Sequence, residues 1–199
     1  NSKILSSKAL YREALKQLKK AKELARKFSN HIILLETLIA ERNIISVMPD
    51  KNISEMRKQL YEEQADALRM LGKNFEYSWL SDQMVICVEQ KGDFTDSERS
   101  KEMDKIMQMP LISKDSMAED LNMKFYQLHT KLFYYLGKNE LINVKLQLEK
   151  EIELLEANRH FIDHNPKNYS SALINYLLFS QITGYRKYVL SALSKLNDL

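Results

Sequence analysis

The sequence predicts an all-α protein in which about nine helices form antiparallel hairpins stacked as an α-α superhelix. Three observations predict this fold class. Apolar residues recur at helical spacing along nearly the whole chain, glycine and proline are scarce, and those that occur fall between the periodic segments. Glycine and proline destabilise helix interiors by roughly 1 and 3 kcal/mol respectively, so their positions predict helix ends.

The expected turns follow from this punctuation. The glycines and prolines are Pro49, Gly72, Gly92, Pro110, Gly137, Pro166 and Gly184. Capping-box spacing marks three helix starts independently: Asn52 with Glu55, Thr95 with Glu98, and Ser116 with Glu119. We place the hairpin turns near Pro49, Gly92, Gly137 and Gly184, which gives a two-helix repeat of about 43–47 residues.

The first two predicted helices differ in pattern. The segment 7–28 is amphipathic, with a basic face opposite an apolar stripe. The apolar stripe is Leu10, Ala14, Leu18, Ala21, Ala25 and Phe28, and the basic face is Lys8, Arg12, Lys16, Lys19, Lys22, Arg26 and Lys27. Apolar residues cover most of the circumference of 31–48, so we expect that helix to be buried on several sides.

Amphipathic and apolar segments continue to alternate along the chain. The segments 53–71 and 75–89 are read as two helices separated by a stop at Gly72, and 95–109 is short and charged. After them, 116–136 is rich in large apolar side chains. The segment 140–163 is long and amphipathic, with Glu149, Lys150, Glu151, Glu153 and Glu156 expected toward solvent. The segment 169–183 is apolar almost all round, and 186–196 closes the chain.

One short string occurs twice. Leu-Gly-Lys-Asn is found at 71–74 and again at 136–139, 65 positions later. We interpret it as shared stop chemistry, a glycine with a basic helix end, and not as the register of a repeat.

Composition limits the remaining possibilities. The net charge is only +3, although residues 1–30 hold nine Lys or Arg and two Glu. The uncharged run 168–185 contains Asn, Ser, Gln and Thr, which favours a buried helix over a membrane span. No signal peptide is visible, and a cytoplasmic location is favoured. We expect 1–199 to be a single helical-repeat domain and a fragment of a longer chain.

Two stretches resemble the helices of tetratricopeptide repeats. Tyr11-Arg12-Glu13-Ala14 with Leu18 and Ala21 resembles the second helix of a repeat, with Leu18 in place of the usual aromatic residue. Tyr61, Ala65, Leu68 and Gly72 resemble the first helix, with Tyr for Trp and Ala for Gly.

A third stretch is similar to the helix junctions of divergent bacterial proteins of this kind. It comprises Asn165-Pro166-Lys167-Asn168-Tyr169 and the following Asn175-Tyr176. No unit satisfies the complete consensus, which leaves the subfamily open. The resemblance implies a superhelical scaffold that binds peptides or protein surfaces.

Tyrosines in the final third are the candidate partner-binding residues. We assign this role to Tyr126, Tyr134, Tyr169, Asn175 and Tyr176. Tyrosine buries a large area at low entropic cost and keeps a polar tip. The alternative is packing between repeats, with the hydroxyls bonded locally.

No residue pattern predicts catalysis, a cofactor or a metal site. His160 and His164 share a helix face beside Asp163, but no third ligand stands at a convincing spacing. Cys87 lies in an apolar run and is interpreted as a core residue. The basic face of 7–28 lacks interleaved aromatic residues, so direct nucleic acid binding is not expected.

The leading prediction is therefore a non-catalytic helical-repeat scaffold that binds a protein or peptide. The alternative is the sensory or dimerisation domain of a bacterial transcriptional regulator whose DNA-binding module lies outside this segment. A small all-helical enzyme is a third alternative.

Overall fold

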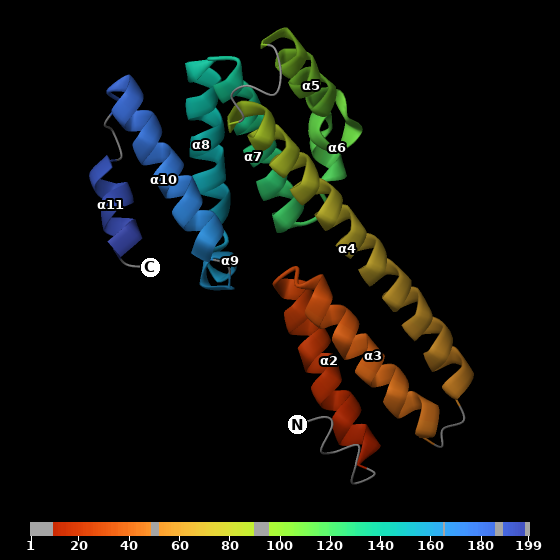
Figure 1. Ribbon diagram of the computed structural model, residues 1–199. Helices are drawn as coiled ribbons and strands as arrows, with labels where there is room; N and C mark the ends of the chain where they lie inside the picture. The colour runs from red at the N-terminus through yellow and green to blue at the C-terminus, as the bar shows by residue number, and fades with distance from the viewer. Residues whose placement is uncertain (1–9, 49–51, 90–95, 165, 186–188, 198–199) are drawn as a thin grey trace. The chain divides into compact units, whose positions relative to one another are not determined.

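The computed structural model describes residues 10–48, 52–89, 96–164, 166–185 and 189–197 (Figure 1). All regular structure within these ranges is helical, which confirms the all-α prediction. The chain divides into two compact units, Asn1–Phe75 and Glu76–Leu199. A single domain and a stacked superhelix stay predictions. The turns predicted at Pro49 and Gly92 and the cap predicted at Thr95 fall outside the described residues.

The N-terminal unit is built from α2 (Tyr11–Lys27), α3 (His31–Val47) and the first part of α4 (Ile53–Glu89). Asn30 caps α3, because its side chain accepts a hydrogen bond from the N–H of Ile33 at 3.0 Å. The buried residues form two clusters: Ala25, Leu34, Leu38, Ile45, Leu60 and Ala67, and Ala14, Leu18 and Ile44. Each of the three helices therefore contributes one face to this core.

The same turn joins α2 to α3 and, in the other unit, α7 (Leu121–Gly137) to α8 (Leu141–Glu156). Ser29 and Asn139 adopt positive φ angles of 50° and 58°. The next N–H donates back to the helix in both turns, Asn30 to the Ala25 carbonyl and Glu140 to the Tyr135 carbonyl, each at 2.9 Å. The hairpin predicted at Gly137 is confirmed. The turn between α2 and α3 contains neither glycine nor proline, so these residues do not predict that hairpin.

Helix α4 is continuous from Ile53 to Glu89, so the predicted stop at Gly72 is wrong. Gly72 lies in the middle of the helix, and its neighbours Met70, Leu71 and Lys73 are strong helix formers. Asn74, which follows two positions later, is compatible with a turn but stays within the helix, where its side chain donates to the Met70 carbonyl. One glycine costs roughly 1 kcal/mol in a helix interior, which the surrounding residues offset.

Substituting Gly72 by alanine is expected to raise the free energy of unfolding by about 1 kcal/mol, since alanine loses less conformational entropy in a helix. A Cβ atom at Gly72 meets nothing within 4 Å. Urea unfolding followed by circular dichroism measures the change. The matched control is Gly137→Ala, whose Cβ would overlap the Met103 side chain, so that variant is expected to be less stable. Equal effects of the two substitutions would contradict this account.

The C-terminal unit begins with the second part of α4, followed by α5 (Asp96–Gln108), α6 (Pro110–Ser113), the 3-10 helix η1 (Asp115–Met117) and α7. Helix α7 starts at Leu121, with Asp120 accepting from the N–H of Met123 at 2.9 Å, so the predicted cap at Ser116 is wrong. The buried Gln127 side chain donates to the carbonyls of Leu111, Ile112 and Lys114. These bonds hold the α6–η1 segment against α7.

The unit ends with α8, α9 (Arg159–His164), α10 (Pro166–Thr183) and α11 (Val189–Asn197). The predicted helix 140–163 is interrupted after Glu156, where the Asn158 side chain donates to the Leu154 carbonyl. Helix α10 packs against both α8 and α11 (Figure 1). The core here comprises Phe125, Leu132, Val144, Leu148, Leu155, Phe161, Ile162, Tyr169, Ala172, Leu173, Tyr176, Phe179 and Ala192.

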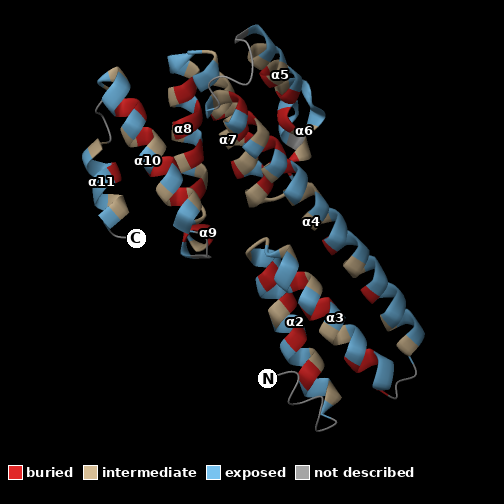
Figure 2. Ribbon diagram, in the orientation of Figure 1, coloured by how far each residue is buried: buried red, intermediate tan, exposed pale blue. Residues whose placement is uncertain are grey.

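Two helices predicted to be buried on several sides each expose apolar residues (Figure 2). On α3 these are Ile32, Ile33, Ile39 and Val47, and on α10 they are Ile174, Leu178 and Ile182. Apolar content alone did not reveal how many sides of each helix would be covered. Ile174, Leu178 and Ile182 recur every four residues, which places them on one face of α10.

Candidate functional site

A groove with a volume of about 410 Å³ runs between α8, α10 and α11 of the C-terminal unit. Its apolar floor is formed by Ile152, Leu173, Tyr176 and Ala192. Its polar rim is formed by Lys145, Glu149, Glu153, Glu156, Ser191 and Lys195. We call this the C-terminal groove. Apolar surface flanked by polar groups that fix orientation is the usual composition of a binding site.

At one end of the groove, Glu156 joins the three helices. The Tyr169 hydroxyl on α10 donates to Glu156 Oε1 at 2.8 Å, and Lys195 Nζ on α11 contacts the same oxygen. Burial raises the pKa of Tyr169, and the bond to the Glu156 carboxylate raises it further. Tyr169 therefore stays a neutral donor, and the contact fixes the distance between the groove walls.

The other end of the groove is marked by Lys145. Its Nζ lies 4.2 Å from the centroid of the Tyr185 ring and 3.9 Å from Glu149 Oε1. Eleven helical steps separate Lys145 from Glu156, a rise of about 16 Å. This length accommodates about five residues of an extended peptide.

The middle of the groove is acidic. Three carboxylates and two ammonium groups line the whole groove, and Glu153 lies between its two ends. Lys195 contacts Glu156 and Lys145 lies near Glu149, whereas the exposed Glu153 makes no ion pair within the described ranges. The arrangement favours a ligand that presents a cationic group beside a small apolar one.

The structure places the predicted tyrosines in different surroundings. Tyr176 lies in the groove floor but is only 1% exposed, and Tyr169 is 5% exposed. Tyr126 is half-buried against the core cluster. Tyr134 lies on α7, where its hydroxyl donates to Asp104 at 2.9 Å, and burial together with this carboxylate raises its pKa to about 12.

Of the five predicted residues, only Tyr169 and Tyr176 are thus associated with the groove. Tyr176 forms part of its floor, and Tyr169 donates a hydrogen bond to Glu156 on its rim. Asn175 is half-buried on α10 and does not line the groove. A role in partner binding for the five residues stays a prediction.

The rim residues were not identified from the sequence. The amphipathic pattern of 140–163 predicts ordinary solvent-exposed positions for Glu149, Glu153 and Glu156. Their spacing at i, i+4 and i+7 shows that they share a helix face. Nothing in that spacing indicates that α10 and α11 lie beside this face, because the neighbouring walls come from residues later in the chain.

A buried pair of ionisable groups lies elsewhere in the same unit. Glu151, predicted to face solvent, is instead fully buried, with its Oε1 3.2 Å from His129 Nδ1. The His129 ring stacks on Phe125 and meets the edge of Phe133. Burial raises the pKa of Glu151, while the contact with His129 acts in the opposite direction. A substrate cannot reach this carboxylate without opening the packing of α8.

The structure also places the cysteine and the histidine group that the sequence analysis considered as possible reactive or metal-binding residues. Cys87 is buried, as predicted, and burial is the first cause of its raised pKa. His160 and Asp163 lie on the short helix α9. Within the part of the chain that the structure describes, no three His, Cys, Asp or Glu side chains are grouped to hold a metal ion.

Comparisons of the chain with known protein families, curated proteins and solved structures found no match. The resemblance to tetratricopeptide repeats therefore stays a prediction that depends on the quoted residues alone. Among the described helices, none has the length and apolar character needed to cross a membrane.

Proposed function

We propose that the chain is a non-catalytic helical-repeat scaffold and that it binds a protein or peptide partner in the C-terminal groove. The observation that supports this most is the composition of the groove. An apolar floor of Ile152, Leu173 and Ala192 lies beneath a rim of charged side chains over a length of about 16 Å. A short peptide segment has the matching length and mixed chemistry.

Binding would combine an apolar anchor with one ion pair. A small apolar side chain of the partner contacts Ile152, the partly exposed residue of the floor, and a lysine or arginine of the partner reaches Glu153. The walls are already held together through Glu156, so little conformational entropy is lost when the segment enters. An interface of this size is of the transient class, with a Kd on the order of micromolar.

Replacing Ser191 by tryptophan is expected to weaken peptide binding by at least about tenfold, because the indole would occupy the groove. Ser194→Trp is the matched control: both serines are exposed on α11, but only Ser191 lines the groove. Peptides selected from a displayed random library against the whole chain provide the probe. Fluorescence anisotropy of a selected peptide then gives the Kd for the parent and for both variants.

The selected peptides should be enriched in a lysine or arginine next to a small apolar residue. Ser194→Trp should change the Kd by less than about twofold. Equal losses in the two tryptophan variants, or a selection that yields no binding peptide, would refute the groove as the binding site. Circular dichroism of each variant checks that the helices are intact.

A further inference from the structure

We propose that a second groove, between α2 and α4 of the N-terminal unit, binds an acidic segment of a partner protein. This groove has a volume of about 510 Å³ and lies in a different unit from the C-terminal groove. It is lined by Leu15, Lys16, Lys19, Lys22, Glu23, Arg26, Glu41, Met56, Gln59 and Glu63. We call it the N-terminal groove.

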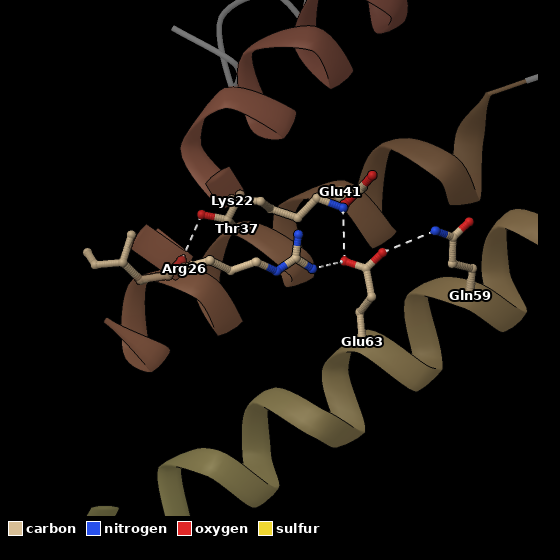
Figure 3. A network of polar contacts seen from close by, with 7 residues as sticks. Lys22, Arg26, Thr37, Glu41, Gln59 and Glu63 are labelled. Carbon is tan, nitrogen blue, oxygen red and sulfur yellow. Dashed lines mark hydrogen bonds and ion pairs between the residues drawn. The ribbon is translucent and has the colours of Figure 1, made fainter. Parts of the chain in front are cut away.

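The floor of the N-terminal groove is a network of paired charges (Figure 3). Lys22 Nζ lies 2.7 Å from Glu41 Oε2 on α3, and it donates to Glu63 Oε2 on α4 at 3.1 Å. Arg26 donates to the same Glu63 oxygen at 2.7 Å. The network therefore links all three helices of the unit and sets the spacing of the groove walls before a ligand arrives.

Lys22 corrects the sequence interpretation, which placed it on the solvent face of α2. It is 8% exposed and lies on the buried side of the helix with Ala14, Leu18 and Ala25. Its burial is tolerated because two carboxylates surround the ammonium group. Burial raises the pKa of Glu63, but the hydrogen bonds from Lys22 and Arg26 outweigh burial and leave that pKa below its usual 4.5.

The rim of this groove, unlike its paired floor, carries a small excess of positive charge, because Lys16 and Lys19 stand against the single exposed carboxylate of Glu23. Lys16 and Lys19 are exposed and form no ion pair within the described residues. They stand three residues apart on α2, so their Cβ atoms are about 5–6 Å apart and one carboxylate can reach both. Leu15 and Met56 add apolar surface beside them. Cationic and apolar groups in one groove match a segment that carries both acidic and apolar side chains.

The lining favours an acidic protein segment over a nucleic acid. Glu23 also lines the groove, so a ligand with widely spaced carboxylates fits better than a strand that carries a phosphate at every residue. No aromatic ring is present among its lining residues, so bases have no surface on which to stack. A peptide can instead place a carboxylate at Lys16 and Lys19 and an apolar side chain on Met56.

The test uses the whole chain and three fluorescein-labelled probes. The first is an amphipathic peptide with Glu and Leu at helical spacing, the second carries Lys in place of each Glu, and the third is a single-stranded oligonucleotide of the same net charge as the first. The double variant Lys16→Glu/Lys19→Glu reverses the rim charge. Lys20→Glu/Lys27→Glu is the matched control, because both of its lysines are exposed on α2 but do not line the groove.

We expect the acidic peptide to bind most tightly and the rim variant to lose at least about tenfold in affinity. The control variant should lose less than about threefold, through long-range attraction only. In methyl NMR spectra, the Met56 signal should shift when the acidic peptide is added, because Met56 lines the groove beside Lys16 and Lys19.

Three outcomes would overturn the proposal: equal losses in the two double variants, tighter binding of the oligonucleotide than of the acidic peptide, or no binding of the acidic peptide. Ser191→Trp should leave acidic-peptide binding unchanged, since it alters only the C-terminal groove. Failure at one groove is therefore distinguishable from failure at the other.

Discussion

Replacing Lys22 by alanine is expected to lower the free energy of unfolding by about 3 kcal/mol, because it leaves two partly buried carboxylates without their shared cation. Glu41 and Glu63 retain only 16% and 21% of their side-chain exposure, so water compensates incompletely for the lost ammonium group. Arg26 still reaches Glu63, but Glu41 loses the ion pair found in the native network. Urea unfolding at neutral pH measures the difference.

Lys19→Ala is the control for this experiment, since Lys19 is exposed on the same helix and forms no ion pair in the described residues. Its expected effect on the free energy of unfolding is within about 0.5 kcal/mol.

The pH dependence of stability gives a second check. The folded-state pKa of Glu63 is lowered, so its contribution is present above pH 4.5 and is lost as the pH falls through the folded-state value. The difference in free energy of unfolding between the parent and Lys22→Ala should therefore become smaller in acid. A difference that is already small at neutral pH, or that does not change in acid, would contradict the proposed role of the network.

Replacing Tyr176 by alanine is expected to cost about 3–5 kcal/mol of stability, the usual range when a large buried aromatic side chain is removed. Tyr176 is 1% exposed and belongs to the core cluster formed by α7 to α11. Its loss leaves a cavity next to Leu173 that the surrounding helices fill only partly. Thermal and urea unfolding of the C-terminal unit measure the effect.

The companion substitution is Tyr169→Phe, which keeps the ring and removes only the hydroxyl that donates to Glu156. Its expected cost is about 1.5–3 kcal/mol, the value of one hydrogen bond to a charged group. An alanine at Tyr176 that unfolds no more readily than the parent would show that this ring is not packed as described. Loss of partner binding in a Tyr169/Tyr176 double alanine variant would thus report on folding as much as on recognition.

The sequence predicted the helical class and several helix ends from local signals. The turn at Gly137 and the start of α3 after Asn30 both follow from residues within one helical turn. The same reasoning failed at Gly72, because an identical Leu-Gly-Lys-Asn string is compatible with a helix end and with a helix interior. The backbone differs between the two copies, since Asn139 adopts a positive φ angle and ends its helix, whereas Asn74 lies inside α4.

Burial of polar residues was less predictable, because the partners that make it possible lie far away in the chain. Glu63 is 41 positions from Lys22, and Glu151 is 22 positions from His129. A helical pattern assigns both Lys22 and Glu151 to solvent by residue type. The sequence does not predict the rim of the C-terminal groove for a related reason: the helices that form its walls come together only in the folded unit.

The continuity of α4 has a thermodynamic consequence. The two units meet at Phe75 and Glu76, inside a helix whose backbone hydrogen bonds run across that boundary. If one unit unfolds, the other is left with a new helix terminus and about four backbone groups without intrahelical partners. The unit that stays folded is destabilised by the loss of those hydrogen bonds. The residues at which the two units divide are therefore held by the hydrogen bonds of α4 itself, and a break in the chain there would open a helix and not a loop.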